Sequence, residues 1–389
     1  MYVFTFLFLL VAVCEIWFRI EPEPPGPGRN FKAITIPRLA QYWLNRDNAN
    51  PLLPPFKFFS NTDFRNQERL HLIASQMSLP RNKVLESYDF LRPAEFREKT
   101  SYTATINNLG FRGPQRTVQK PENVFRIIAL GSYHTFGHAV NDEDTYPSQL
   151  EQRLNSQKTD TVYEVWNYGN QEGSAIVGLA KLQMEILDYK PDLIIWDYGY
   201  IDPVIMGDNQ FLGGFFFPES GIYRPLMWFL HLAGNVIVRK SMIYDKFRDY
   251  LVTRIMKKNI AAFADVTMQM LKTAEEKQIP VIILRQSVIH SISPAFYRKL
   301  ADSYKLASFI DGEKIFERYP PSHEMTVDFY AGLNWLSEFD PSLGKDKTWY
   351  PPEYFIDIFQ YNKWGHKAIA TYLSDEIAVI KERMLSKNL

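Results

Sequence analysis

The sequence predicts a three-layer α/β/α protein built on a doubly wound parallel sheet of about five strands. From Phe125 onward, short apolar runs alternate with stretches whose apolar residues recur every three or four positions, as strands alternating with crossover helices do. The first expected strand, residues 125–131, is a continuous apolar run typical of a strand buried on both faces. The 389 residues exceed an average domain, although one α/β domain with a large insertion also fits this length.

Four more strands and four helices continue the alternation. The strands are expected at residues 162–168, 193–198, 281–284 and 308–310, and the helices at residues 146–155, 174–187, 259–278 and 365–383. In the second of these helices, Leu179, Leu182 and Ile186 fall on one face as a core-facing stripe. A doubly wound sheet places its chemistry beyond the carboxyl ends of its strands. Functional residues are therefore expected in the loops that follow the strands.

A long insertion, residues 204–258, separates the third expected strand from the fourth. It contains two aromatic runs, residues 211–217 (FLGGFFF) and 226–230 (LMWFL). One interpretation is a helical cap that buries its own aromatic side chains. The alternative is a lid that binds acyl groups, or a patch in contact with a membrane. Neither run reaches the length of a membrane span.

The first 20 residues predict a membrane anchor. Tyr2 to Cys14 is an uncharged apolar run, shorter than the roughly 20 residues of a spanning helix but extended by residues 16–18. A cleaved signal peptide is the rival interpretation, although no basic residue precedes the run and no small-residue cleavage site follows it. Basic residues follow the segment and none precedes it, which favours the cytoplasmic side for the body. The sequence does not decide on which side of the membrane the body lies.

The remaining chain divides into a spacer, an arm and the main domain. Residues 21–30 are rich in Pro and Gly and predict an extended, semi-stiff spacer. Residues 31–99 mix short amphipathic stretches with prolines, and we expect them to form an N-terminal arm packed on the main domain, residues 100–389. The pattern assigns no function to the arm.

The composition excludes several classes of function. Lys plus Arg and Asp plus Glu both total 44, so no excess of positive charge directs the chain toward nucleic acid. The chain contains no phosphate-binding or dinucleotide-binding glycine motif and no H-E-x-x-H motif. We therefore expect no cofactor and no metal. Cys14 is the one cysteine, so disulfides do not hold the fold.

Short sequence blocks follow the ends of the expected strands. They are residues 107–113 (NNLGFRG), 130–137 (LGSYHTFG), 167–169 (NYG), 199–202 (GYID), 309–311 (FID) and 357–366 (DIFQYNKWGH). In this order and at these places they resemble the blocks of the SGNH (GDSL-type) hydrolase superfamily, whose sheet is flavodoxin-like. The resemblance covers about residues 100–385. Each block alone is unspecific, and the specificity comes from their order and position.

The resemblance implies a set of catalytic positions. In this superfamily a serine attacks an ester carbonyl, a histidine takes its proton, and an aspartate three residues earlier orients the imidazole ring. The nucleophile's N–H, a glycine and an asparagine form the oxyanion hole. These roles, in the order nucleophile, glycine, asparagine, aspartate and histidine, fall on Tyr133, Gly169, Ile201, Asp357 and Gln360. Only Gly169 and Asp357 match the family's residue types.

The three departures remove the family's chemistry. A tyrosine hydroxyl has a pKa of about 10, and the ring of Tyr133 would fill the space that an ester carbonyl enters. Gln360 cannot act as a base at neutral pH, and Ile201 offers no donor to an oxyanion. Loss of triad members costs on the order of a millionfold in rate. We therefore expect hydrolysis by the family's route to be lost.

Hydrolysis could also proceed at a shifted site built from residues next to Tyr133 in the sequence. Ser132 with His134 or His138 is the candidate pair, although consecutive residues leaving a strand point to opposite sides. A metal held by His134, His138 and Asp357 lacks any recognised ligand spacing. His366 is expected to be a structural cap or packing residue. Asp202 and Asp357 are candidates for a polar network with Tyr133 or Gln360, and Asp311 is expected to end its strand.

Three hypotheses follow from these observations. The first is a non-catalytic protein of the cell envelope, which uses the old cleft to bind an acyl or glycan group or another surface to bind a protein partner. The second is an active esterase or O-acyltransferase that acts on envelope lipid or glycan esters through a rearranged site. The third is a structural envelope component in which Tyr133 fills the cleft. The first is favoured.

Overall fold

The computed structural model describes most of the predicted main domain. It describes residues 66–88, 101–157, 159–170, 173–199, 202, 209–212, 215–218, 242–285, 292–320 and 361–387. The expected anchor (1–20), the spacer (21–30) and the positions Ile201, Asp357 and Gln360 lie outside the described residues. No helix in the described ranges is both long and apolar enough to cross a membrane.

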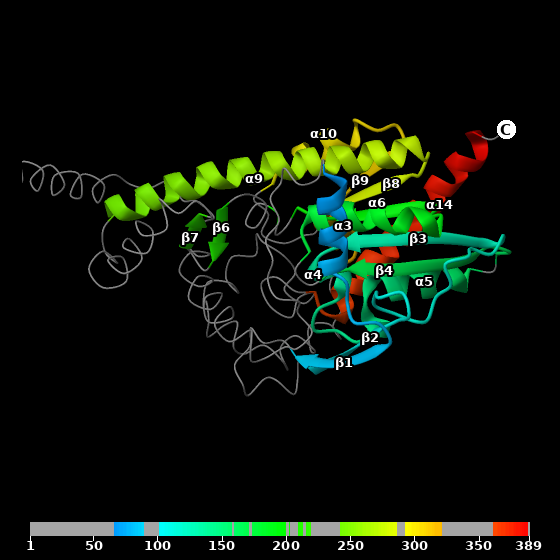
Figure 1. Ribbon diagram of the computed structural model, residues 1–389. Coiled ribbons are helices and arrows are strands. Elements are labelled where there is room, and N and C mark those ends of the chain that lie inside the picture. Colours follow the sequence, from blue (N-terminus) through cyan, green and yellow to red (C-terminus); the bar gives the residue numbers. More distant parts are fainter. Residues whose placement is uncertain are drawn as a thin grey trace, which may run out of the picture.

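Five parallel strands form the central sheet. They are β3 (Val124–Gly131), β4 (Val162–Gly169), β5 (Leu193–Asp197), β8 (Val281–Arg285) and β9 (Ala307–Asp311), in the spatial order β4-β3-β5-β8-β9 (Figure 1). Each strand coincides with a run that the sequence predicts, and the order is the flavodoxin-like one, in which the second strand lies outside the first. The prediction of a five-stranded parallel sheet is confirmed.

Helices cover both faces of this sheet. Residues of α3 (Gln67–Gln76), α6 (Ala175–Met184), α9 (Met242–Glu276) and α10 (Pro294–Ala301) share one buried cluster with one set of strand residues. Residues of α5 (Tyr146–Ser156), α11 (Gly312–Arg318) and α14 (Lys363–Lys387) share a second cluster with the alternate strand residues. The result is the three-layer α/β/α arrangement.

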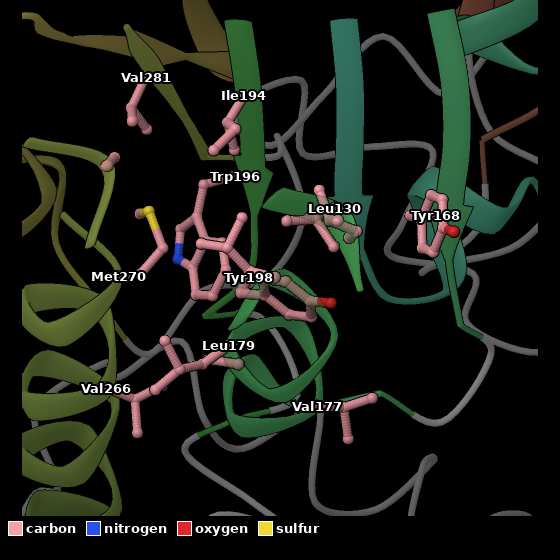
Figure 2. Close-up of a cluster of buried hydrophobic side chains, with 14 of the residues drawn as sticks. Leu130, Tyr168, Val177, Leu179, Ile194, Trp196, Tyr198, Val266, Met270 and Val281 are labelled. Carbon is pink, nitrogen blue, oxygen red and sulfur yellow. The ribbon is translucent and has the colours of Figure 1, made fainter. Parts of the chain in front are cut away.

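The alternation of the strands separates the two clusters. In β3, Ile128 and Leu130 enter the cluster with α6 and α9, whereas Ile127 and Ala129 enter the one with α5 and α14. All four are fully buried, so this part of the strand is apolar on both faces, as a sheet covered on both sides requires. Figure 2 shows part of the first cluster, where Trp196 lies between strand residues and the α9 side chain of Met270.

The insertion differs from its sequence prediction in two places. Helix α9 begins at Met242 and not near Asn259, because no Gly or Pro interrupts the helical sequence between Met242 and Glu276. The aromatic run expected in a helical cap instead forms β6 (Asn209–Leu212) and β7 (Phe215–Pro218), paired antiparallel. A two-residue Gly-Gly loop between aromatic stretches favours such a hairpin. The amino-terminal half of α9 extends past the sheet in Figure 1.

The segment before the main sheet also has regular structure. Leu70 and Ile73 of α3 are fully buried in the same cluster as Trp166 of β4. Strand β1 (Lys83–Tyr88) pairs antiparallel with β2 (Ser101–Ile106), so paired strands lie on either side of the boundary expected at residue 100.

Candidate functional site

The candidate site lies beyond the carboxyl ends of β3 and β5. The strand order reverses between these two neighbours, which is the point where open α/β sheets bind ligands. After β3, Ser132 precedes the short helix α4 (Tyr133–Phe136). After β5, Gly199 adopts a positive φ of 104° and Asp202 follows. The site is therefore framed by α4 on one side and the turn at Gly199 on the other.

Tyr133 occupies the first position of α4 in a packed environment. Its side chain is 9% exposed, and its ring meets His138 edge-on with centroids 6.1 Å apart at 89°. His138 Nδ1 in turn lies 3.2 Å from the hydroxyl of Tyr102. Tyr133 thus lies at the nucleophile position that the resemblance implies. Its ring contacts His138, and His138 in turn contacts Tyr102.

Arg112 donates hydrogen bonds to the carbonyl groups at the carboxyl-terminal end of α4. Its guanidinium donates to the carbonyls of Phe136 at 2.9 Å and Gly137 at 2.6 Å, and to Asp142 at 2.6 Å. Its second terminal nitrogen donates to two further carbonyls, those of Thr103 at 2.8 Å and Val140 at 2.7 Å. Burial lowers the pKa of Arg112, and the charge of Asp142 opposes that effect. Carbonyls at a helix C-terminus lack intrahelical donors, and this side chain supplies them.

Gly169 has a structural role that accounts for its identity. A Cβ at this position would collide with the backbone nitrogen of Phe136, so α4 packs directly on the glycine. The N–H of Gly169 donates to the side-chain oxygen of Asn167 at 3.0 Å, and the amide nitrogen of Asn167 donates to the Phe136 carbonyl at 3.3 Å. The oxyanion donor expected at Gly169 is therefore already hydrogen-bonded within the chain.

A buried polar network lies behind α4. The hydroxyl of Thr135 donates to Asp197 at 2.6 Å and lies 3.1 Å from the hydroxyl of Tyr146. The backbone N–H of Tyr146 donates to His366 Nδ1 at 3.2 Å. Burial, and then the nearby His134 and Arg112, lowers the pKa of His366 to about 3, so the ring stays neutral and accepts this bond. His366 thereby joins the start of α5 to α14.

Replacing His366 tests this assignment through pH. Its pKa of about 3 in the folded protein lies below the ordinary value of 6.5, so the unfolded chain binds more protons between these values. The stabilising contribution is complete above pH 6.5 and is lost as the pH falls toward 3. We expect His366→Gln to flatten this part of the stability profile, measured by urea unfolding of both proteins at each pH. Identical slopes for the two proteins would contradict a neutral, buried His366.

The residues proposed for a shifted site are close in sequence, but no hydrogen bond of the described residues connects the serine to a histidine that could accept its proton. Ser132 makes no side-chain cap bond to α4. The ring of His134 packs against Tyr361, with centroids 5.1 Å apart, and His138 contacts Tyr102 and Tyr133. Across the described ranges, no hydrogen bond joins Ser132 to either histidine. The same ranges contain no group of three or more His, Cys, Asp or Glu side chains able to hold a metal.

Asp202 has a role that the sequence did not reveal. One carboxylate oxygen accepts the N–H of Ala175, the first residue of α6, at 2.6 Å, and the other accepts the N–H of Gly199 at 2.7 Å. Burial raises the pKa of Asp202 to about 6, against the lowering effect of these backbone bonds. Ser174, the residue before α6, makes no side-chain cap bond. Serine is itself a preferred N-cap residue, so the sequence carries no signal that a distant acceptor serves this helix.

An ion pair joins the carboxyl ends of β8 and β9. Arg285 and Asp311 are opposite each other in the sheet, and their side chains meet at 2.7 Å. Arg285 also reaches Glu313 at 3.0 Å, and Asp311 accepts the N–H of Glu313 at the start of α11. Asp311 ends its strand and caps the following helix, so this pair is accounted for by the fold.

Comparisons with known proteins find similarity to solved structures only. No protein-family model matches the chain, and no curated protein matches it. A protein from Desulfitobacterium hafniense DCB-2, described as a lipolytic protein of the G-D-S-L family, is 14% identical over 64% of this chain and 98% of its own, with a TM-score of 0.35. The acetyl xylan esterase AlAXEase is 13% identical over 65% of this chain and 99% of its own, with a TM-score of 0.35.

A third solved structure is larger than this chain's matching part. The two-domain esterase CEX, active on acetylated mannans, is 12% identical over 65% of this chain, with a TM-score of 0.37. The match spans about half of that esterase, 49% of its length. The solved structures to which this chain is similar therefore include esterases of the SGNH and GDSL type.

Proposed function

We propose that this chain is a non-hydrolytic, SGNH-hydrolase-like protein of the cell envelope that binds an acyl or glycan group, or a protein partner. In this proposal residues 1–20 anchor it in a membrane. The observation that carries the proposal is Tyr133, a buried phenol at the first position of α4 where the superfamily places its attacking serine.

The surroundings of Tyr133 support the loss of hydrolysis. A phenol of pKa about 10 is a poor nucleophile without a base, and its ring is held against His138. The N–H of Gly169 donates to the side-chain oxygen of Asn167, so this donor is already used and does not serve an oxyanion. The sequence provides Ile201 and Gln360 at the remaining donor and base positions. Each of the three kinds of group that ester hydrolysis needs is therefore replaced or occupied.

Two features favour binding over a purely structural role. The site lies at the switch point of the sheet, where α/β folds bind ligands irrespective of catalysis. The aromatic runs of the insertion, residues 211–217 and 226–230, provide apolar side chains suited to an acyl chain or to the faces of a sugar. The superfamily's usual ligands, esters of lipids and glycans, suggest these two classes.

A labelling experiment tests the proposal. The full chain in detergent is expected to hydrolyse p-nitrophenyl acetate no faster than buffer and to take up no fluorophosphonate probe at any serine, because no serine is activated. The triple variant Tyr133→Ser, Ile201→Asn, Gln360→His serves as the matched comparison, and a folded active esterase made in this way would show that the cleft itself is intact. Probe bound at Ser132 of the unmodified chain, abolished by Ser132→Ala, would instead establish the enzyme hypothesis.

A further inference from the structure

The outer edge of strand β1 carries backbone groups that point away from its partner β2. Thr103 and Thr105 of β2 direct their N–H groups away from β1, to the side chains of residues 141–142 at 3.0 and 2.9 Å. Opposite residues of an antiparallel pair that exchange no hydrogen bonds direct their backbone groups to opposite sides. Glu86 lies opposite Thr103, and Val84 lies opposite Thr105. The N–H and C=O groups of Val84 and Glu86 therefore point to the outer side of β1.

This outer side is accessible. Within the described ranges β1 pairs with β2 alone, and no hydrogen bond there reaches the outward backbone groups of Val84 or Glu86. Val84 is 66% exposed, and Glu86 is exposed as well. Figure 1 shows β1 farther from the central sheet than β2. A strand can therefore be added to β1 without displacing any part of the described chain.

The chain closes another strand edge with side chains. Strand β4 lies at one edge of the central sheet, and the N–H groups of Tyr163 and Val165 point outward from it. The first donates to Asn155 at 2.9 Å and the second to Glu151 at 2.6 Å, both on α5. Side chains that occupy an edge in this way prevent pairing with strands of other chains. The edge of β1 has no such cover among the described residues, so it is open to a pairing that β4 excludes.

We propose that β1 pairs antiparallel with β1 of a second copy of this chain. The two small sheets would join into one sheet of four strands across a two-fold axis. With Leu85 of both copies on the axis, the outward groups of Val84 in each copy bond to those of Glu86 in the other. A two-stranded pair is weakly stable by itself and gains from added strands. The inference goes beyond the proposed function and does not rest on it.

The charges of β1 favour a second copy in this orientation. Arg81 and Lys83 lie at the start of the strand and Glu86 lies toward its end, and all three are exposed. In an antiparallel pair the basic start of each strand lies near the acidic end of the other, whereas a parallel pair brings like charges together. A strand with charges of one sign would repel its own copy. The mixed signs of β1 instead make it complementary to itself.

Sedimentation of the full chain in density-matched detergent, over a range of protein concentrations, tests the pairing. The unmodified chain is expected to dimerise reversibly. Val84→Pro removes an outward N–H that does not bond to β2, so the β1–β2 pair is kept. We expect this variant to dimerise at least about tenfold more weakly. Val84→Thr keeps both the N–H and the β-branched shape, and it is the matched control that should dimerise like the unmodified chain.

Two charge variants test the orientation without changing the backbone. Lys83→Glu makes β1 acidic, and Glu86→Lys makes it basic. Each variant alone is expected to dimerise more weakly than the unmodified chain, because like charges then meet across the axis. An equimolar mixture of the two is expected to recover the dimer as a heterodimer, which sedimentation of one fluorescently labelled variant detects.

Three outcomes would overturn the proposal. The first is an unmodified chain that stays monomeric at every concentration. The second is a dimer that forms equally well in Val84→Pro and in both charge variants, because such a dimer uses another surface. The third is a monomeric chain in which the Val84 amide is protected from hydrogen exchange, because another segment of the same chain would then occupy the edge.

Discussion

Replacing Arg112 with methionine is expected to lower the free energy of unfolding by about 3–5 kcal/mol. The side chain is 1% exposed and donates five hydrogen bonds, four of them to backbone carbonyls at the end of α4 and in its neighbouring loops. Methionine fills similar volume but removes all five bonds, and the Phe136 carbonyl keeps only the longer bond from Asn167 at 3.3 Å. Unsatisfied buried acceptors each cost on the order of 1–3 kcal/mol.

The measurement is urea unfolding of the full chain followed by tryptophan fluorescence. Arg112→Lys is the matched variant, because it keeps the positive charge and loses the planar fork that reaches several acceptors at once. We expect it to recover only part of the loss. A value for Arg112→Met within about 1 kcal/mol of the unmodified protein would show that these bonds do not hold α4.

Adding a single methyl group at position 169 is expected to have the second large effect. In Gly169→Ala the new carbon would collide with the backbone nitrogen of Phe136, and a backbone atom cannot move aside by changing its rotamer. Overpacking of this kind costs at least about 1–3 kcal/mol and displaces α4, with Tyr133 at its first position.

Gly113→Ala provides the comparison. At Gly113 a Cβ meets nothing within 4 Å, although the φ of 124° strains any side chain there. Its cost reports backbone strain alone, so a larger loss at Gly169, measured by thermal unfolding, isolates the collision with α4. Near-ultraviolet circular dichroism is expected to change only in Gly169→Ala, because the Tyr133 and His138 rings shift with the helix. Equal stability of the two variants would contradict the close packing at Gly169.

The strands of the sheet were predictable because the residues of each strand are themselves mostly apolar, which indicates burial without reference to the rest of the chain. A parallel strand covered on both faces is apolar at nearly every position, so runs such as residues 125–131 and 281–284 mark themselves. The start of α9 was not marked in this way. Its first turns, residues 242–258, mix charged and apolar side chains, so no continuous apolar run indicates where the helix begins.

The groups that hold the site together were harder to predict for a different reason. Arg112 and Asp202 act on backbone atoms that are distant in sequence: Arg112 reaches Val140, and Asp202 reaches Ala175. Backbone acceptors and donors carry no residue signature, so the sequence gives no pattern to recognise. The position of Tyr133 after β3 was predictable because residues on both sides of it fixed the alignment.

The unbroken course of α9 has a mechanical consequence for the insertion. The carboxyl-terminal half of this 35-residue helix is embedded in the core through Phe263, Val266 and Met270, all fully buried. Helix formation is limited by nucleation, and the embedded half supplies the nucleus for the turns that precede it. At its carboxyl-terminal end the insertion thus continues into the body within one helix, which is about 50 Å long including its embedded half. A force applied at Met242 would be transmitted along this helix to the layer beneath the sheet.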